Sequence, residues 1–187
     1  AGAAIDAAVH QILEEIGLSQ APDTGVAYMT SVGALAGDDG RVRFPRALVD
    51  DMLAKAARNI TLHGQDPKHD MLLSGSRVHY GTAGAAVHVV DVENNAYRES
   101  YLADIYDAAR IVEKMDNIHF FQRPMVARDI EDPAALALNT VYAAVKGTTK
   151  HVGTSFTEAI YFAPALSMLH DIAGGEDKWR ARPFVSN

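Results

Sequence analysis

The chain has 187 residues, of which 48% are hydrophobic and 22% are charged, and its formal net charge at pH 7 is −7. This composition is typical of a globular domain with a sizeable core. The negative charge argues against nucleic acid and anionic membrane surfaces as partners, because both attract clustered Lys and Arg. Cysteine is absent, which excludes disulfides, cysteine zinc sites and thiol nucleophiles.

No apolar run approaches the roughly 18 residues that a bilayer-spanning helix needs, and the first residues lack the basic and apolar regions of a signal peptide. We therefore expect a cytoplasmic protein with no membrane segment. The chain starts without Met and stops in a segment that resembles a strand. We therefore also expect it to be part of a longer protein.

The spacing of apolar residues predicts helices within the first 57 residues. The first helix ends at Gly17, which suits a C-terminal cap. Its apolar stripe consists of Ile5, Val9, Ile12, Leu13 and Ile16. A second helix is predicted over 25–36, a short extended piece at 41–44, and a third helix from Pro45 to about residue 57.

Short extended segments follow in residues 58–99. Strands are predicted at 60–63, 78–81 and 86–92. The turn at 93–95 allows Tyr97 and Arg98 to pair back as a hairpin. This part of the chain therefore predicts a mixed sheet.

From Ser100 onward, helices alternate with strands. Ser100 is placed to cap a helix over 101–115. The other predicted elements are strands at 118–121, 151–156 and 184–186 and helices at 132–145 and 157–172. The alternation implies parallel pairing with right-handed crossovers.

The predicted strands start about 33 residues apart, a period that fits a TIM (β/α)8 barrel and, nearly as well, a doubly wound sheet. We predict an α/β protein with a partial TIM barrel. Residues 1–99 form its N-terminal helical and mixed-strand segment, and residues 100–187 form the first βα units of the incomplete barrel.

Active sites of both architectures lie at the carboxyl ends of the parallel strands. This rule points to residues 122–125, 154–156 and 186–187, and from these we choose Arg123, Thr154, Phe156 and Asn187 as candidates for substrate binding. Arg123 suits a carboxylate, which a guanidinium binds through two parallel hydrogen bonds. The alternative is a surface ion pair between Arg123 and Asp129 or Glu131.

Tyr80 and Thr82 are two further candidates for substrate binding, at the glycine-rich segment 81–86. This segment is neither a phosphate loop nor a dinucleotide loop, because it lacks Gly-Lys-Ser/Thr and precedes a strand instead of a helix. Close backbone packing is the preferred interpretation of its glycines. The other interpretation is close approach of a substrate to the backbone.

The remaining polar residues form no recognised catalytic motif, so the sequence assigns no catalytic residue. The eight histidines show no metal-ligand spacing, and we expect no metal site. Lys150 and His151 stand at the start of a predicted strand, away from the predicted site.

Aromatic faces can hold a quaternary ammonium by cation–π attraction, although most aromatic residues in strands belong to the core. The candidates for such an aromatic box are Tyr80, Tyr97, Tyr101, Phe120, Phe121 and Phe156.

In order and spacing, seven segments of the chain resemble the N-terminal part of the trimethylamine methyltransferase family. They are AAVHQILEEIG (7–17), VRFPRALV (42–49), TLHGQDP (61–67), VHYGTAG (78–84), NIHFFQRP (117–124), TTKHV (148–152) and RPFVS (182–186). Together they extend over the whole chain.

The resemblance implies a (β/α)8 barrel of roughly twice this length or more. It also implies methyl transfer from a methylated or quaternary amine, such as trimethylamine or glycine betaine, to the Co(I) of a corrinoid. The corrinoid is carried by a separate protein, so the expected partners are a small methylated amine and a corrinoid protein, with no cofactor bound by this chain. Some family members carry pyrrolysine, and many lack it. This part of the protein is expected to be inactive alone.

Two other functions stay open. One is a non-catalytic binding protein for a quaternary amine. The other is a different TIM-barrel enzyme acting on a small anion, which would need a base or a Schiff-base lysine at a strand end. An incomplete parallel sheet exposes an unpaired edge, so we also expect a homo-oligomer.

Overall fold

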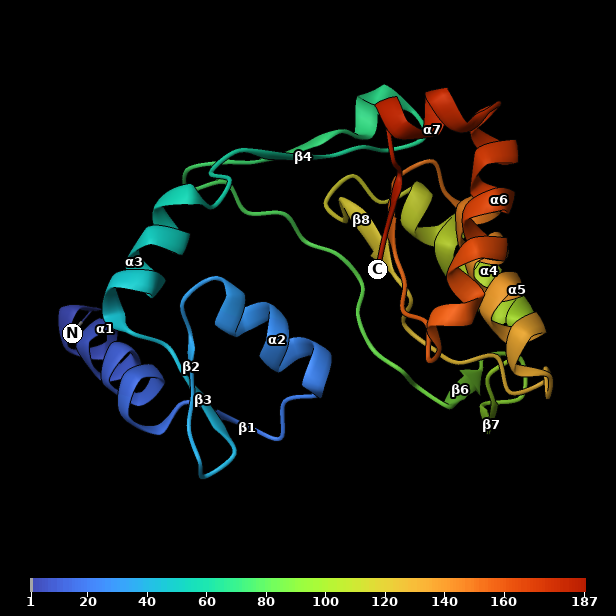
Figure 1. Ribbon diagram of the computed structural model, residues 1–187. Helices are drawn as coiled ribbons and strands as arrows, with labels where there is room; N and C mark the ends of the chain where they lie inside the picture. Colours follow the sequence, from blue (N-terminus) through green and yellow to red (C-terminus); the bar gives the residue numbers. More distant parts are fainter. Residues whose placement is uncertain (1) are drawn as a thin grey trace. The chain divides into compact units, whose positions relative to one another are not determined.

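The computed structural model describes residues 2–187, and the chain divides between residues 57 and 58 into two compact units (Figure 1). The predicted boundary at residues 99 and 100 marks the start of the βα pattern and stays a prediction. Among residues 2–187, no helix combines the length and the apolarity that crossing a bilayer requires.

The N-terminal unit combines three helices with a small antiparallel sheet. Its elements are α1 (Gly2–Gln11), a π-helical turn (Ile12–Ile16), β1 (Leu18–Ser19), α2 (Asp23–Ser31), β2 (Leu35–Ala36), β3 (Arg41–Arg43) and α3 (Arg46–Lys55). The strand order is β1-β3-β2, with Val42 of the central strand buried. Gly17 ends the first helical segment at a φ of +70°, as predicted, and a Cβ atom there would overlap the Val42 carbonyl.

One prediction for this unit is wrong. The helix predicted over 25–36 ends at Ser31, and residues 35–36 pair with β3 instead. The apolar stripe of the first helix is exposed for the most part, and His10 is the buried residue of α1. His10 contacts the backbone oxygen of Asp6 at 2.9 Å and the carboxylate of Asp50 on α3 at 3.0 Å. The apolar periodicity predicted the helix correctly. The contact between His10 and Asp50 then buries the polar side chain of His10.

The C-terminal unit, residues 58–187, contains two antiparallel hairpins and a parallel sheet with helices. The hairpins are β4 (Ile60–Leu62) with β5 (Met71–Leu73), and β6 (His88–Asp91) with β7 (Ala96–Glu99). The helices and parallel strands are α4 (Leu102–Glu113), β8 (Phe120–Gln122), α5 (Pro133–Gly147), β9 (His151–Gly153), α6 (Phe162–Ala173), α7 (Glu176–Ala181) and β10 (Val185–Ser186). Short 3₁₀ turns cover Pro67–His69 and Ala159–Tyr161.

The predicted parallel pairing is confirmed. The strand order is β10-β9-β8, and Val152 aligns with Phe121 on one side and Val185 on the other. Parallel bridges from Gly81 to Phe120 and from Ala86 to Met125 place the glycine-rich segment beside β8. The unit is thus a mixed α/β structure. No closed barrel is present among residues 2–187, and the partial TIM barrel stays a prediction.

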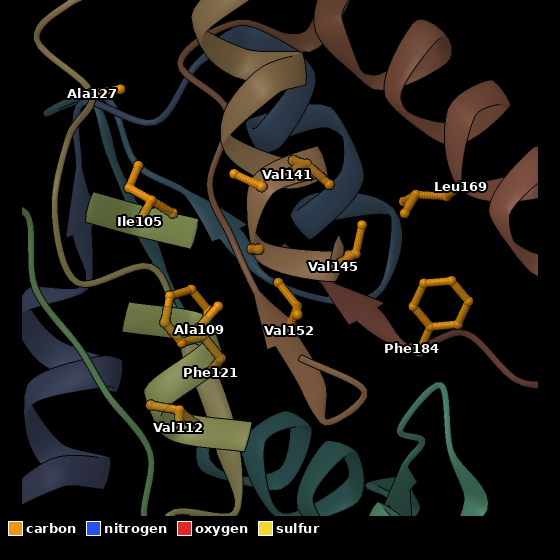
Figure 2. Close-up of a cluster of buried hydrophobic side chains, with 12 residues drawn as sticks. Ile105, Ala109, Val112, Phe121, Ala127, Val141, Val145, Val152, Leu169 and Phe184 are labelled. Atoms are coloured by element: carbon orange, nitrogen blue, oxygen red, sulfur yellow. The ribbon is translucent and has the colours of Figure 1, made fainter. Parts of the chain in front are cut away.

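One face of the parallel sheet is covered by helices, which Figure 1 shows gathered on one side of the strands. Figure 2 shows the core between them, where Phe121 and Val152 meet side chains from α4, α5 and α6. The buried members are Ile105, Ala109, Val112, Phe121, Ala127, Val141, Ala143, Ala144, Val145, Val152, Leu169 and Phe184. Three of these residues, Ile105, Ala109 and Val112, lie at helical spacing on α4 and face the sheet.

The start of α4 differs from the prediction that Ser100 caps it. The Ser100 hydroxyl is buried and donates to the Val126 carbonyl at 2.7 Å. The first amides of the helix instead donate to carboxylates. Asp104 accepts from Tyr101 N at 2.7 Å, and Asp129 accepts from Leu102 N at 2.9 Å. Carboxylates at a helix N-terminus are favoured by its dipole.

A buried lysine closes the amino end of the parallel sheet. Lys150 is 3% exposed, and its ammonium donates to the carbonyls of Val112, Met115 and Ile118 at 2.6–2.7 Å. The carbonyl of Val112 belongs to the last turn of α4, and that of Met115 lies just beyond the helix. Backbone oxygens at a helix C-terminus lack helical partners. Burial lowers the pKa of Lys150, and the three carbonyls compensate by binding the ammonium.

The loop between β4 and β5 covers the same end of the sheet. The Gln65 amide donates to the carbonyls of Val145 and Thr148 at 2.7 and 2.8 Å. Asp70 binds both terminal nitrogens of Arg182, at 2.7 and 3.0 Å. Burial would raise the pKa of Asp70, but hydrogen bonds led by Arg182 hold it below its ordinary value. The amide of Gln65 and the charged groups of Asp70 and Arg182 at this end are therefore bound by protein partners.

Replacing Lys150 with Met is expected to lower the free energy of unfolding by about 2–4 kcal/mol, because three carbonyls lose their donor. Urea unfolding, followed by the fluorescence of Trp179, measures the change. The control is Lys146→Met, at an exposed lysine four residues away, which should change stability by less than about 0.5 kcal/mol. Equal stability of the two variants would contradict a structural role for Lys150.

Candidate functional site

The segments at the carboxyl ends of the parallel strands are joined by hydrogen bonds to backbone carbonyls. At β8, the Thr82 hydroxyl donates to the Gln122 carbonyl at 2.6 Å. Between β8 and β9, Arg123 N donates to the Gly153 carbonyl at 3.2 Å. Between β9 and β10, Thr154 N donates to the Ser186 carbonyl at 2.9 Å. Five of the six predicted site residues lie along this edge, which we call the carboxyl edge.

Arg123 is a cation without a carboxylate partner among the residues that the structure describes. Its guanidinium donates to the Ser155 hydroxyl at 3.3 Å, and no ion pair to Asp129 or Glu131 forms. Asp129 is instead bound to the first amide of α4. The alternative interpretation of Arg123, a surface ion pair with either acid, is therefore wrong. A partly buried guanidinium with one neutral partner retains donors for an anion.

Thr154, Phe156 and Asn187 lie together at the ends of β9 and β10. The Asn187 side chain accepts from Phe156 N at 3.0 Å, and the Phe156 ring packs on Phe162 with ring centres 4.9 Å apart. Thr154 is 6% exposed, and its buried hydroxyl has no hydrogen-bond partner within residues 2–187. A buried unsatisfied hydroxyl is costly, so it marks a position where a ligand group would be favoured.

Tyr80 does not lie at this edge. Its backbone nitrogen donates to His119 Nδ1 at 2.9 Å, and its backbone oxygen accepts from His119 N at 2.7 Å. This pairing places Tyr80 beside the start of β8, two residues before Thr82 reaches the strand's end. The glycines beside it serve packing, as preferred from the sequence, because a Cβ atom on Gly81 would overlap the Phe120 ring.

The six aromatic side chains proposed for a quaternary-ammonium box do not converge. Phe121 is fully buried in the core, and Phe120 packs over Gly81. Tyr97 lies against His88, and Tyr101 lies under the Arg98 guanidinium. Each aromatic side chain thus has a separate neighbourhood, and the predicted box is wrong.

His151 is the first residue of β9, and its ring lies on the face of the sheet that the helices leave uncovered. It is 2% exposed. Its Nδ1 lies 2.8 Å from the His63 carbonyl oxygen, and its Nε2 lies 3.0 Å from the Ser186 hydroxyl. Burial lowers the pKa of His151 below its ordinary value of 6.5. The ring is therefore neutral near pH 7.

Other histidines contact one another or the backbone. The rings of His79 and His119 pack edge to face, with centres 5.3 Å apart. Within residues 2–187, no three His, Cys, Asp or Glu side chains are grouped so that they could hold a metal ion.

Gln122, Ser155 and Ser186 stand at the predicted strand ends but are not among the chosen substrate-binding candidates, and neither is His151. Gln122 and Ser186 share a register position with Gly153, and only strand alignment reveals this. His151 was interpreted as a residue that packs at the start of a strand. The signal that could have found it is alternation, since Val152 faces the core and its neighbours must face the other way.

The fold and the site define an α/β protein with unsatisfied polar groups at the carboxyl ends of parallel strands, where ligands bind in such sheets. The family model of the trimethylamine methyltransferases (MTTB) matches residues 1–187, so the chain belongs to this family.

Individual relatives agree with this assignment. The chain is 29% identical over 184 residues to trimethylamine methyltransferase MttB of Desulfitobacterium hafniense (strain DSM 10664 / DCB-2), with 98% of this chain and 37% of the relative covered. It is 30% identical over 151 residues to trimethylamine methyltransferase MttB of Methanosarcina barkeri, covering 78% of this chain and 30% of the relative.

A relative with another printed substrate is glycine betaine methyltransferase of Desulfitobacterium hafniense (strain Y51). It is 22% identical over 176 residues, with 94% of this chain and 36% of the relative covered. The chain thus spans little more than a third of the length of these Desulfitobacterium relatives.

The buried neutral His151 predicts a pH-dependent stability. Its folded pKa lies below the unfolded value, so the unfolded chain binds the proton first, and stability is lost as the pH falls below about 6.5. His151→Asn keeps a donor toward the His63 carbonyl but does not titrate. The wild-type advantage in unfolding free energy over this variant should therefore shrink between pH 7.5 and 5.5, by up to about 1.4 kcal/mol per pH unit. A constant difference would contradict the buried neutral state.

Proposed function

We propose that the protein transfers a methyl group from a methylated or quaternary amine, such as trimethylamine or a glycine betaine-like compound, to the Co(I) of a corrinoid on a partner protein. Membership of the trimethylamine methyltransferase family supports methyl transfer from an amine. The carboxyl edge supplies the position for the amine. The corrinoid partner, a completed (β/α)8 barrel, self-association and a cytoplasmic location belong to the same proposal.

The chemistry places modest demands on this chain. The N–CH₃ bond breaks, its electron pair stays on nitrogen, and the remaining amine leaves. The corrinoid would supply the nucleophile that accepts the methyl group, so no side-chain nucleophile is needed. The chain's task is to bind the amine and orient one methyl group outward. Because the partner holds the corrinoid, the proposal asks for no metal ligands from residues 2–187.

Arg123 is the observation that carries the substrate side of the proposal. Its guanidinium lies at the carboxyl edge, with a serine hydroxyl as its hydrogen-bond partner and no carboxylate within the described residues. A methylated amine that carries its own carboxylate would form the missing ion pair with the Arg123 guanidinium. The hydroxyl of Thr154, which has no partner among the described residues, could donate a further hydrogen bond to that carboxylate. We therefore favour a betaine-like methyl donor over trimethylamine.

The chemistry of Lys150 argues against a different barrel enzyme that uses a Schiff-base lysine. Its ammonium is bound to three carbonyls at the amino end of β9, opposite to the carboxyl edge. A non-catalytic amine-binding protein makes a different prediction, because it would bind the amine and transfer no methyl group.

The full-length protein should convert cob(I)alamin to methylcobalamin under strictly anaerobic conditions. Absorbance follows the reaction with trimethylamine, dimethylamine, glycine betaine, carnitine and proline betaine as donors. We expect methylation with a carboxylate-bearing quaternary amine. Methylation with trimethylamine alone would contradict the role of Arg123, and binding without methylation by any donor would favour the non-catalytic alternative.

Arg123→Met is expected to raise KM for a betaine-like donor by about 10- to 100-fold, because hydrogen bonds to a charged partner contribute about 1.5–3 kcal/mol. The control is Arg128→Met, at an exposed arginine paired with Glu99, which should leave KM unchanged. Steady-state methyl transfer measures both variants. Similar KM values for the two variants would show that Arg123 does not bind the donor.

A further inference from the structure

Three residues form a cross-strand row on the face of the parallel sheet that the helices leave uncovered. Gly153 of β9 aligns with Gln122 of β8 and with Ser186 of β10. Their neighbours Phe121 and Val152 point into the helix-covered core. Because side chains alternate along strands, the three aligned residues share the opposite face. We call them the Gly153 row.

The Gln122 side chain covers the middle of the row. A Cβ atom on Gly153 would overlap the side-chain amide of Gln122, so that amide lies over the glycine. Within residues 2–187 the Gln122 amide makes no hydrogen bond. Gly153 has no positive φ that would require glycine. Close approach of the Gln122 amide is therefore the reason for glycine here, and this amide is left without a hydrogen-bond partner among the described residues.

His151 fixes the direction of the Ser186 hydroxyl. The His63 carbonyl can only accept a hydrogen bond, so His151 Nδ1, at 2.8 Å, must carry the ring proton. In the neutral ring Nε2 then has a lone pair, and the Ser186 hydroxyl, at 3.0 Å, must donate to it. Ser186 is exposed. With its proton committed to His151, its oxygen offers lone pairs to anything above the row.

We propose that the Gly153 row seats the ammonium group of the methyl donor, with Ser186 as a specificity-determining acceptor that His151 holds in position. This inference rests on the proposed function and extends it by assigning the cationic end of the substrate.

The chemistry of the row favours a cation over an anion. No basic side chain belongs to it, and the Ser186 oxygen faces outward with lone pairs only. The Gln122 amide can turn its oxygen in the same direction. Such oxygens attract the polarised N–CH₃ groups of a methylated ammonium by C–H···O contacts and by their dipoles. The neighbouring Arg123 is the cation of the site, so the two ends of a betaine would have separate positions.

Tetramethylammonium separates these two positions, because it has the ammonium group and no carboxylate. We expect the full-length protein to bind tetramethylammonium in calorimetric titration. Ser186→Ala should raise the Kd by roughly three- to tenfold, and Ser186→Thr, which keeps the hydroxyl on a residue suited to strands, should restore it. Arg123→Met should leave the Kd for tetramethylammonium unchanged while weakening glycine betaine binding.

Three results would overturn this inference: no binding of tetramethylammonium by the wild type, an unchanged Kd in Ser186→Ala, or an equal loss in Arg123→Met. Denaturation midpoints of the variants show whether folding is retained. Because binding is measured without methyl transfer, this test is independent of the proposed function. If the wild type methylates cob(I)alamin while Ser186→Ala binds tetramethylammonium normally, the proposed ammonium position at the Gly153 row is refuted and the proposed methyl transfer stands.

The positioning role of His151 has its own readout. ¹⁵N shifts of labelled histidine should show a protonated Nδ1 and an unprotonated Nε2 for His151 at pH 7.5. The Nε2 shift should change in Ser186→Ala, because its hydrogen-bond donor is gone. A proton on Nε2 in the wild type would turn the Ser186 proton toward the ligand and overturn the assigned role.

Discussion

The placement of β9 is the constraint on which the site depends. This strand has parallel neighbours on both sides, and its central residue, Val152, is completely buried under the helices. Lys150 anchors its start to the end of α4, and His151 ties it to the loop after β4. With β9 fixed on both sides, Gly153 aligns Gln122 with Ser186, and Thr154 follows at the carboxyl edge. A shift of one residue would turn each of these side chains to the opposite face.

The two ends of the parallel sheet differ in how their polar groups are satisfied. At the amino end, the charged groups of Lys150, Asp70 and Arg182 bind protein partners. At the carboxyl edge, Arg123 lacks a carboxylate and the Thr154 hydroxyl lacks any partner in the described part of the chain. Buried polar groups in proteins are normally paired. The charged groups at the amino end therefore serve the structure, whereas Arg123 and Thr154 at the carboxyl edge retain hydrogen-bonding capacity for a ligand.

Local sequence patterns predicted the repeating elements of the C-terminal unit well. The strands near 120, 151 and 185 and the intervening helices follow from short apolar runs and helical periodicity. The strand-end rule selected Arg123, Thr154, Phe156 and Asn187, which lie at one edge, and Thr82 of the glycine-rich segment lies there too. Tyr80 does not lie at this edge, because its backbone pairs with His119 at the start of β8. Ser100 failed as a cap because a distant carboxylate, that of Asp129, binds the helix amide instead.

Other features depend on contacts that no local pattern contains. The tautomer of His151 is set by a carbonyl 88 residues away, and the Gly153 row exists only through the register of three strands. The N-terminal helix buries His10 in preference to its apolar stripe because Asp50 on another helix binds the ring. The sequence thus predicts which elements form, and long-range polar contacts decide which side chains meet.

The most direct test of the proposed site is a crystal structure of the full-length protein with glycine betaine bound. We expect the trimethylammonium group over Gly153, against Gln122 and Ser186, and the carboxylate at the Arg123 guanidinium. Betaine bound away from the carboxyl edge, for example at the amino end of the strands near Lys150, would contradict this placement.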